Sequence, residues 1–360
     1  MTIQTNLKAK PSMIKAYFFV LSFFIVGLCM AQKPTIYVLA TGGTIAGTGT
    51  SQTTSAYKAG EVSVEQLLNA VPSLADIASI RSEQVVNIGS QDMNIEVWLK
   101  LAARINELAK DPGINGFVIT HGTDTQEETA YFLNLVAKTD KPIVMVGSMR
   151  PSTALGADGP RNLFNAVACA ASPQSRGRGV MVVMNDVILG ADDLEKTHTL
   201  SVQTFQNPNY GPLGIMYNKQ PFYSRNTLKK HTSESEFDVT GLKTLPRVEI
   251  VMGYAGAGKL FVDAATHAGV QGLVYAGVGN GNMAAEVVSA LAAAVKNGVA
   301  VVRSSRLPAG PTSQWDEVDD DANGFAASWF LTPQKARILL MLALTKTKNY
   351  KEIQRIFTEY

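Results

Sequence analysis

The sequence is poor in the residues from which most metal and reactive-thiol sites are built. Among its 360 residues there are two cysteines and four histidines, and the histidines lack the spacing of metal ligands. No G-x-S-x-G nucleophile elbow occurs, and no G-x-G-x-x-G follows the first predicted strand. These gaps argue against a zinc enzyme, an elbow-type serine hydrolase and a Rossmann dinucleotide site, so we expect neither metal nor cofactor. The four histidines are His121, His198, His231 and His267.

An excess of charge of either sign is also missing. Lysine and arginine number 32 and aspartate and glutamate 30, so the formal net charge is +2. This near-neutrality argues against a polyanion binder that relies on bulk electrostatics, and we expect no nucleic-acid partner. Hydrophobic residues make up 46% of the chain, which is typical of a folded protein, and the length suggests about two domains at roughly 100–200 residues each.

Long apolar runs are absent except at the N-terminus. Three lysines precede the apolar residues 16–30, and Cys29-Met30-Ala31 offers small residues where a signal peptidase cuts. The run is about 15 residues long, which is short of the ~20 needed to span a bilayer. We interpret residues 1–31 as a secretory signal peptide cleaved after Ala31, with a membrane anchor or a lipoprotein leader modified at Cys29 as alternatives. After cleavage we expect no membrane attachment.

Cleavage would leave a single cysteine. The mature chain would carry 29 basic and 30 acidic residues, with a net charge of about −1, and Cys169 could form no intrachain disulfide. Cys169 lies in the helical-looking stretch 161–172 (RNLFNAVACAAS). We therefore expect a small buried core residue rather than a nucleophile.

Short apolar strands alternate with helices along the rest of the chain. Strands that are apolar throughout predict a parallel sheet covered on both faces. We predict an α/β fold of two domains, with a larger N-terminal, mostly parallel sheet with flanking helices (32–223), a linker (224–246) and a smaller C-terminal parallel α/β domain (247–360). The predicted strands are 35–40, 85–88, 116–120, 142–146, 179–184, 248–252, 272–275 and 300–303, and the predicted helices are 92–110 with Asp92 as its cap, 127–137, 162–171, 261–267, 283–297 and, last, 333–345.

Polar loops follow these strands, and an open α/β sheet binds ligands beyond the carboxyl ends of its strands. The loops contain hydroxyls, carboxylates, one lysine and glycines that allow close backbone approach. A threonine hydroxyl becomes a nucleophile only when a base takes its proton, and a lysine beside an aspartate can shuttle that proton. Backbone N–H groups of the loops can stabilise an oxyanion. The residues of these loops together therefore fit acyl transfer. For any single loop, ordinary turn and cap roles remain the alternative. The loops are 41–44 (TGGT), 89–92 (GSQD), 121–125 (HGTDT), 192–197 (DDLEKT, after the strand 179–184) and 279–282 (GNGN).

One further segment has the spacing of a phosphate-binding loop. Residues 253–260 (GYAGAGKL) fit G-x-x-x-x-G-K, but Leu260 stands where a serine or threonine would bind Mg²⁺. We interpret it as a strand-to-helix turn, and nucleotide binding through Lys259 is the alternative.

Two segments carry a family resemblance. Residues 39–47 (LATGGTIAG) and 119–130 (ITHGTDTQEETA) resemble the two signature segments of bacterial L-asparaginases. Further stretches are similar to the same family, so the likeness covers about residues 34–360, and the secretory signal makes the chain most similar to the type II, periplasmic form. These stretches are VNIGSQDMN, VGSMRPSTALGADGPRNL, NYGPLG, AGVGNGN, VVRSSR and TPQKAR.

The resemblance implies five catalytic residues. Thr44 would be the nucleophile, and Tyr57, in a flexible loop, would activate it and close over the substrate. Thr123 would be the second essential threonine and would form a second triad with Asp124 and Lys196. Which threonine attacks first stays open.

The resemblance also implies the substrate contacts. Ser90, Gln91 and Gly122 would lie around the α-carboxylate and neighbouring groups, and Asp124 would also hold the α-ammonium. Asn282 and Glu317 would reach in from a neighbouring subunit, so the active site would need a homotetramer built as a pair of tight dimers. Without the family, Glu317 belongs to an acidic run (DEVDDD) typical of a solvated surface.

The implied function is a hydrolase that deamidates L-asparagine to L-aspartate and ammonia by double displacement on threonine. Ala284, at a position that varies in the family near the substrate's end, leaves the preference between asparagine and glutamine open. Three alternatives remain: a glutaminase-asparaginase of broad amide specificity, a non-catalytic periplasmic amino-acid binding protein, and the nucleotide binding through Lys259 described above.

Overall fold

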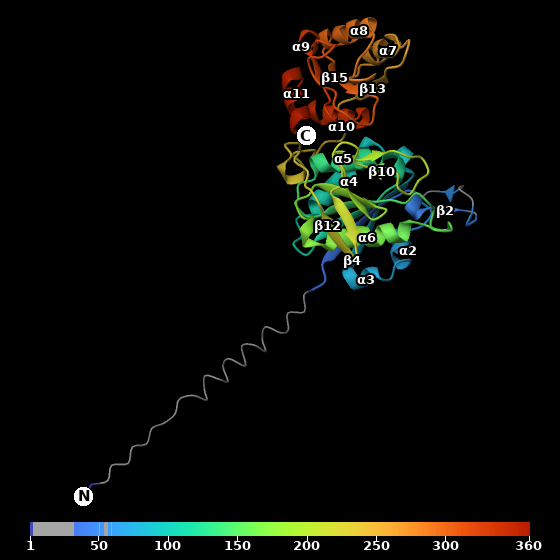
Figure 1. Cartoon of the computed structure of the whole chain (residues 1–360), viewed down its shortest axis with the longest axis vertical. Coiled ribbons are helices and arrows are strands. Elements are labelled where there is room, and N and C mark those ends of the chain that lie inside the picture. Colours follow the sequence, from blue (N-terminus) through green and yellow to red (C-terminus); the bar gives the residue numbers. More distant parts are fainter. Residues whose placement is uncertain (3–31, 50, 54–56, 59) are drawn as a thin grey trace. The chain divides into compact units, whose positions relative to one another are not determined.

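The computed structural model describes residues 1–2, 32–49, 51–53, 57–58 and 60–360 (Figure 1). The chain divides into two compact units, Met1–Lys33 and Pro34–Tyr360, and the second contains every element named below. The predicted signal peptide lies outside the described residues except for its first two positions. Within the described part, no helix combines the length and the apolar character that crossing a membrane requires.

A large sheet forms the core of the N-terminal part. Its strand order is β12-β11-β8-β7-β6-β5-β1-β4, and the five strands from β7 to β4 are mutually parallel, whereas β8, β11 and β12 run antiparallel to their neighbours. This confirms the mostly parallel sheet predicted from the apolar strands. The strands are β1 (Thr35–Gly42), β4 (Ser79–Ile88), β5 (Gly116–Thr120), β6 (Ile143–Val146), β7 (Val180–Met184), β8 (Val187–Gly190), β11 (Gly214–Tyr217) and β12 (Gln220–Tyr223).

Helices cover both faces of this sheet. Val38 and Leu39, adjacent on β1, point to opposite faces and belong to two different apolar clusters. Cys169 is fully buried in the Val38 cluster, as expected of a core residue. The helices on the Leu39 face are α4 (Ile95–Leu108) and α5 (Gln126–Val136), and those on the Val38 face are α2 (Val64–Asn69), α3 (Leu74–Ile77) and α6 (Gly159–Ala171).

The C-terminal part has its own four-stranded sheet, in the order β13-β14-β15-β16, and all of its strands are parallel. Helices α7 and α8 pack on one face, and α10 and α11 pack on the other. The elements are β13 (Val248–Met252), α7 (Leu260–His267), β14 (Gly272–Gly277), α8 (Ala285–Lys296), β15 (Ala300–Ser305), α9 (Asp320–Asn323), β16 (Phe325–Ala327), α10 (Pro333–Ala343) and α11 (Tyr350–Glu359).

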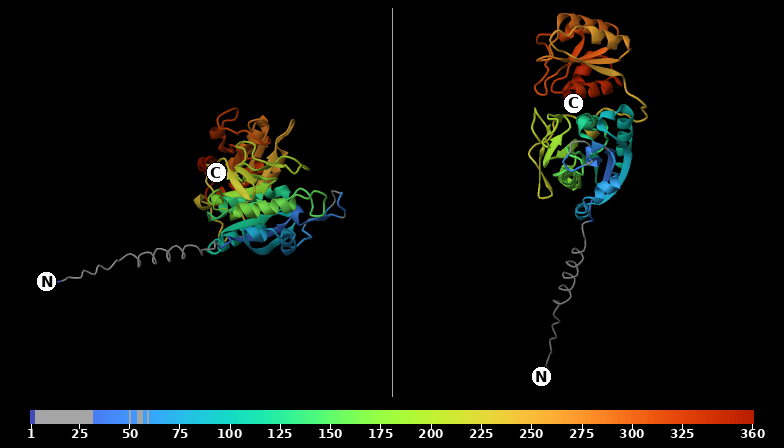
Figure 2. Two further views of the ribbon diagram at one scale, coloured as in Figure 1. Left: turned by 60° about the horizontal axis from the view of Figure 1, so that its bottom comes forward. Right: turned by 90° about the vertical axis from the view of Figure 1, so that its right-hand side faces the viewer.

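One apolar core runs through both sheets. It extends from Leu39 and Phe117 of the large sheet through Phe132 of α5 to Leu340 of α10 and Val274 of the small sheet. The ribbon views agree that the red C-terminal helices lie against the N-terminal part (Figures 1 and 2). Helix α10 of the C-terminal part therefore packs against helix α5 of the N-terminal part.

Two predicted details of the helices are wrong. Asp92 does not cap α4: it ends the 3-10 helix η3 (Ser90–Asp92), and Asn94 is the cap, its side chain accepting from the N–H of Val97 at 3.1 Å. Helix α10 is also not the last, because the amphipathic helix α11 follows it.

The antiparallel strands were not predicted, and they change the path of one polar segment. Two-residue turns with positive φ, at Asn185-Asp186 and Asn218-Lys219, join β7 to β8 and β11 to β12. The segment 192–197 therefore follows β8 rather than the strand 180–184. It includes the short strand β9 (Glu195–Lys196), which pairs with β10 (Phe205–Gln206).

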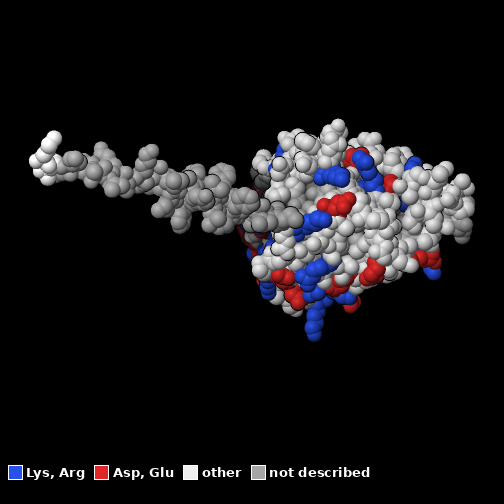
Figure 3. All heavy atoms as spheres, turned by 90° about the horizontal axis from the view of Figure 1, so that it is seen from below, with Lys and Arg blue, Asp and Glu red and all other residues white. Residues whose placement is uncertain are grey.

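The charges of the surface are mixed, as the composition implies. On the face seen in Figure 3, lysine and arginine side chains alternate with aspartate and glutamate over the described residues. This face does not offer the single-sign patch that a polyanion binder needs.

Candidate active site

The loops after β1 and β5 approach each other so closely that only glycine fits between them. Gly43 has φ +84°, and a Cβ there would lie 2.3 Å from the backbone nitrogen of Gly122. A Cβ on Gly122 would in turn lie 2.6 Å from Ser90 Oγ, in the loop after β4. These contacts place Thr44 and Thr123, which follow the two glycines, at the carboxyl edge of neighbouring strands.

Both threonines begin short 3-10 helices and are largely buried. Thr44 opens η2 (Thr44–Ala46) and Thr123 opens η4 (Thr123–Thr125), with 6% and 5% of each residue exposed. Tyr57 follows on β3 (Tyr57–Lys58), where its backbone pairs with Gly49 of β2 (Thr48–Gly49). The expected role of the Tyr57 side chain lies outside what the structure describes.

Lys196 joins two of the predicted residues. Its Nζ donates to Thr123 Oγ1 at 2.9 Å and to Asp124 Oδ1 at 2.6 Å. The lysine side chain is 17% exposed, whereas the carboxylate of Asp124 is 60% exposed. The lysine of this ion pair is thus largely enclosed by the protein, whereas the carboxylate of Asp124 is open to solvent, where a ligand ammonium could bind.

Ser90 connects the loop after β4 to the same group. The backbone N–H of Asp124 donates to Ser90 Oγ at 3.1 Å, and Thr125 Oγ1 donates to the carbonyl of Ser90 at 2.7 Å. Ser90 is buried and the adjacent Gln91 is exposed. A hydroxyl that accepts one bond keeps its own hydrogen to donate, so Ser90 and Gln91 can both donate to an anionic group.

Asn282 and Glu317 contact each other, and both lie in the C-terminal part. Asn282 follows β14, Glu317 precedes α9, and Asn282 Nδ2 donates to Glu317 Oε2 at 2.9 Å. The structure therefore forms two groups of predicted residues, one on each sheet. The group at the carboxyl edge of the large sheet contains Thr44, Ser90, Thr123 and Asp124, together with Lys196 from the neighbouring strand β9.

A buried ion pair fixes the segments that carry Asn282 and Glu317. Arg303 on β15 donates through Nε and Nη2 to both carboxylate oxygens of Asp320, at 2.5 and 2.7 Å, and both side chains are fully buried. Arg303 also donates to the carbonyls of Asn280 at 3.1 Å and Ser313 at 2.9 Å. One guanidinium thus holds together the loop after β14 and the segment before α9.

His121 supports the Thr123 loop from inside the protein. Its Nδ1 lies 2.6 Å from the carbonyl of Gly122, and its Nε2 lies 2.9 Å from Thr129 Oγ1, which accepts from Trp98 Nε1 at 2.8 Å. Burial lowers the pKa of His121 to about 4, so the ring is neutral at neutral pH. Sequence reasoning did not assign this role, because a lone histidine after a strand carries no signal of its partners.

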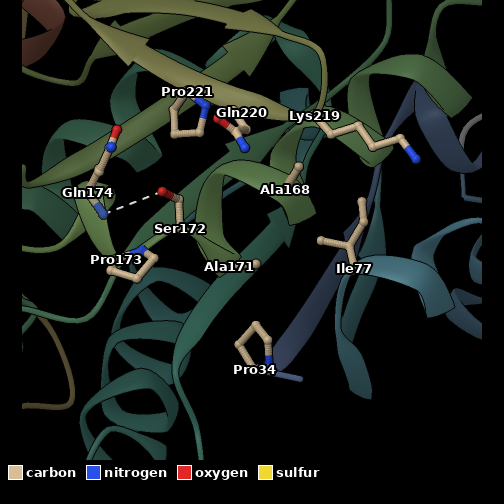
Figure 4. A pocket seen from close by; sticks show the side chains of 10 residues that line it. All are labelled: Pro34, Ile77, Ala168, Ala171, Ser172, Pro173, Gln174, Lys219, Gln220 and Pro221. Carbon is tan, nitrogen blue, oxygen red and sulfur yellow. Dashed lines mark hydrogen bonds between the residues drawn. The ribbon is translucent and has the colours of Figure 1, made fainter. Parts of the chain in front are cut away.

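Two hollows can be compared as ligand sites. One of about 350 Å³ lies beside Asp124 and Lys196 and is also lined by His198. A larger one of about 520 Å³ lies near the amino ends of the strands, where Pro34 precedes β1, and Lys219 is its single charged lining residue (Figure 4). Because ligands of open α/β sheets bind at the carboxyl ends of the strands, the smaller hollow belongs to the candidate site.

The segment resembling a phosphate-binding loop has an ordinary role. Residues 253–259 join β13 to α7, and Lys259 forms an ion pair with Asp263 at 3.5 Å. Leu260 is largely exposed. The geometry confirms the predicted strand-to-helix turn.

The close glycine contact predicts a position-specific effect. Gly43→Ala should destabilise the protein by a further ~1–3 kcal/mol beyond the cost of a left-handed alanine, because its Cβ meets backbone atoms that cannot move aside. Gly177→Ala is the matched control: φ is +66° there, nothing lies within 4 Å of the added Cβ, and the expected cost is about 1–2 kcal/mol. Urea unfolding measures both, and equal losses would contradict the role given to the contact.

Comparisons with known proteins cover nearly the whole described chain. A family model described as "Asparaginase, N-terminal" matches residues 35–229, and one described as "Glutaminase/Asparaginase C-terminal domain" matches residues 247–357. "L-asparaginase 2" of Escherichia coli (strain K12) is 58% identical over 327 residues, covering 91% of this chain and 93% of that protein. "Probable L-asparaginase periplasmic" of Haemophilus influenzae is 54% identical over 330 residues, covering 92% and 94%. Among solved structures, "Probable Cytoplasmic L-asparaginase from Campylobacter jejuni" has a TM-score of 0.89 at 47% identity, covering 91% of this chain and all of that one.

Proposed function

This chain belongs to the asparaginase family, and from that premise we propose that it hydrolyses the side-chain amide of L-asparagine to L-aspartate and ammonia. The observation that carries the proposal is the bonding of Lys196 Nζ to both Thr123 and Asp124, in a loop that touches the Thr44 loop through Gly43 and Gly122. A hydroxyl held by a lysine–carboxylate pair, beside a second buried threonine, is suited to acyl transfer.

A free amino acid is a zwitterion, and the site offers partners for both of its charges. The exposed carboxylate of Asp124 can accept from the α-ammonium, and the Ser90 hydroxyl and Gln91 amide can donate to the α-carboxylate. Charge-assisted hydrogen bonds of this kind are the strong ones. We keep Gly122 as a proposed backbone contact of the substrate; its Cα is packed against Ser90 and Gly43, where no side chain would fit.

The proposed chemistry has two steps. Thr44 Oγ1 attacks the side-chain amide carbon, the C–N bond breaks, and the threonine proton, passed through Tyr57, leaves with the nitrogen as ammonia. Water, positioned by Thr123 with Lys196 and Asp124, then attacks the resulting ester carbonyl and adds its hydroxyl to the acyl carbon. The ester C–O bond breaks, and the proton lost by the water goes to Thr44 Oγ1. Backbone N–H groups of the glycine loops can stabilise the oxyanion in both steps.

We further propose that a neighbouring subunit of a homotetramer supplies Asn282 and Glu317. Two features support this: the pair is prearranged by Arg303, and it lies on the small sheet while the threonines lie on the large one. Met252 and Phe261, in the C-terminal part, are more than half exposed, which favours a subunit contact.

We propose a periplasmic location for the mature chain and keep its division into residues 32–223, 224–246 and 247–360. The basic start and apolar run of residues 1–31 and the periplasmic name of the H. influenzae relative support the location. N-terminal sequencing of protein recovered from the periplasm should begin at Gln32.

Ammonia release tests the function directly. Protein beginning at Gln32 is mixed with L-asparagine and, in parallel, with L-glutamine, without added metal or nucleotide. We expect rapid release from asparagine. A family model named for both activities supports glutaminase activity as the second candidate, and one methylene discriminates by only ~1–3 kcal/mol, or about 10- to 200-fold. Stoichiometric binding of asparagine without ammonia release would overturn the proposal in favour of an amino-acid binding protein.

A further inference from the structure

The strand that carries Lys196 is held from its other side by a buried acidic residue. Side chains alternate along a strand, so Glu195 points away from Thr123 and into the protein. Its side chain is 7% exposed, and Glu195 Oε1 accepts from Lys335 Nζ at 2.5 Å. The carboxylate of Glu195 is therefore bound inside the protein immediately next to the proposed proton shuttle.

The donors to Glu195 all come from the beginning of α10. Thr332 Oγ1 donates to Oε1 at 2.8 Å, and Gln334 Nε2 donates to Oε2 at 3.2 Å, in addition to the bond from Lys335. The positive end of the helix dipole also faces this carboxylate, because α10 begins at Pro333. Three hydrogen bonds and the helix dipole thus hold the side chain of Glu195 on the two-residue strand β9.

A second carboxylate links the same helix to the backbone of Lys196. Gln334 Nε2 donates to Glu127 Oε1 at 3.0 Å, and Glu127 Oε2 accepts the backbone N–H of Lys196. Glu127 lies in the first turn of α5, directly after the Thr123 loop. Helix α10 is therefore joined to the strand of Lys196 in two ways, directly through Glu195 and indirectly through Glu127.

Buried ion pairs seldom add much stability, because desolvation offsets most of the attraction. An apolar pair of similar volume at 195 and 335 could fill the same space, but it would lack the directed bonds from Thr332, Gln334 and Lys335 that fix the side chain of Glu195 on β9. This contrast favours a role in geometry over a role in stability.

We propose that Glu195 and Lys335 are positioning residues for Lys196. Their pair, with Gln334 and Glu127, sets the position of β9 so that Lys196 Nζ reaches Thr123 and Asp124 together. The inference rests on the proposed function, and it makes α10 of the C-terminal part a support of the site on the large sheet.

The charges around the pair predict its pH behaviour. Glu195 faces Glu127 and Glu128 of α5 and Lys335 of α10, and Lys335 also faces Asp193. Burial raises the pKa of Glu195, and Lys335 opposes that rise. Without Lys335 the pKa rises further, so the carboxylate is protonated at a higher pH and the acid limb of kcat should move upward by ~1–3 pH units.

The experiment compares Lys335→Met, Glu195→Gln and the double variant E195Q/K335M with the wild type. The rate constants kcat and KM for asparagine are measured from pH 5 to 9, with the melting temperature recorded for each variant. Lys335→Met should lower kcat by about 10- to 100-fold with little change in KM, since small displacements of a reacting group cost this much. It should also shift the acid limb, whereas E195Q/K335M, which buries no lone charge, should lower kcat without that shift.

Arg104→Met is the matched control, because it breaks a partly buried ion pair with Glu83 that joins α4 to β4 and touches neither β9 nor α10. It should lower the melting temperature and leave kcat and the pH profile unchanged. If Lys335→Met does not fold, the double variant decides. A wild-type kcat in E195Q/K335M overturns the positioning role alone, whereas no ammonia from the wild type overturns the proposed function and this inference with it.

Discussion

Thr44→Ala should lower the rate of ammonia release from asparagine by roughly 10⁴- to 10⁶-fold, the range for loss of a catalytic nucleophile. The change removes the attacking oxygen but leaves the backbone of η2 and its glycine contact in place, since alanine adopts the same conformation. Binding of L-aspartate depends on Ser90, Gln91 and Asp124 in the proposal, so it should persist. Steady-state ammonia release and calorimetric titration with aspartate measure the two quantities.

Thr41→Val is the control, because Thr41 lies near the end of β1, just before the loop that carries Thr44. Thr41 is buried, and its Oγ1 donates to the carbonyl of Thr120 at 2.8 Å. The substitution keeps the shape and removes one hydrogen bond, so it should cost about 1 kcal/mol of stability and leave turnover within a few-fold. Near-normal turnover in Thr44→Ala would rule out Thr44 as the nucleophile.

Thr44→Ala also shows which of the two threonines attacks first. If Thr44 attacks first, Thr44→Ala releases no ammonia even in the first turnover. If Thr123 attacks first, the variant releases up to one equivalent of ammonia per subunit and then stops, because only the second step fails. A rapid-quench measurement at high enzyme concentration distinguishes these results.

The sequence could predict the large features of the fold because they depend on local patterns. Buried, mostly apolar strands such as 116–120 are typical of a parallel sheet covered by helices on both faces, and the loops after parallel strands share one edge for geometric reasons. The polar loop after 116–120 and the loop after 35–40 could thus be placed side by side from residue patterns alone. Strand β8 is only four residues long and β11 alternates buried and exposed residues, so neither shows such a pattern clearly, and both were missed.

The supports of the site could not be predicted, because their partners are far apart in the chain. Lys335 stands in the first turn of an ordinary helix, and its contact with Glu195 spans 140 residues. Glu195 itself resembles a loop acid next to the lysine that the family pattern assigns. Arg303, in an apolar strand, gives no sign in the sequence that its charge is met by Asp320. Only the tertiary structure shows that each of these buried charged side chains has a partner of opposite charge.

Arg303→Met should destabilise the protein by about 3–5 kcal/mol, the usual cost of leaving one member of a buried ion pair without its partner. The substitution leaves the Asp320 carboxylate, fully buried, without the two guanidinium bonds that neutralise it. It also frees the carbonyls of Asn280 and Ser313. Urea unfolding at a fixed protein concentration measures the loss, because oligomer formation makes stability depend on concentration.

The double variant R303M/D320L separates the cost of an unpaired buried charge from the loss of the arrangement that Arg303 fixes. It buries no unpaired charge, so much of the lost stability should return. It still lacks the donor that joins the loop after β14 to the segment before α9, so Asn282 and Glu317 should lose their fixed arrangement. KM for asparagine should therefore be higher than in the wild type, in the double variant as well as in Arg303→Met. The exposed pair of Arg161 and Asp186 is the control, since Arg161→Met should cost less than about 1 kcal/mol and leave KM unchanged. A double variant with wild-type KM would show that Arg303 contributes to stability alone, and that the segments it joins reach their arrangement without it.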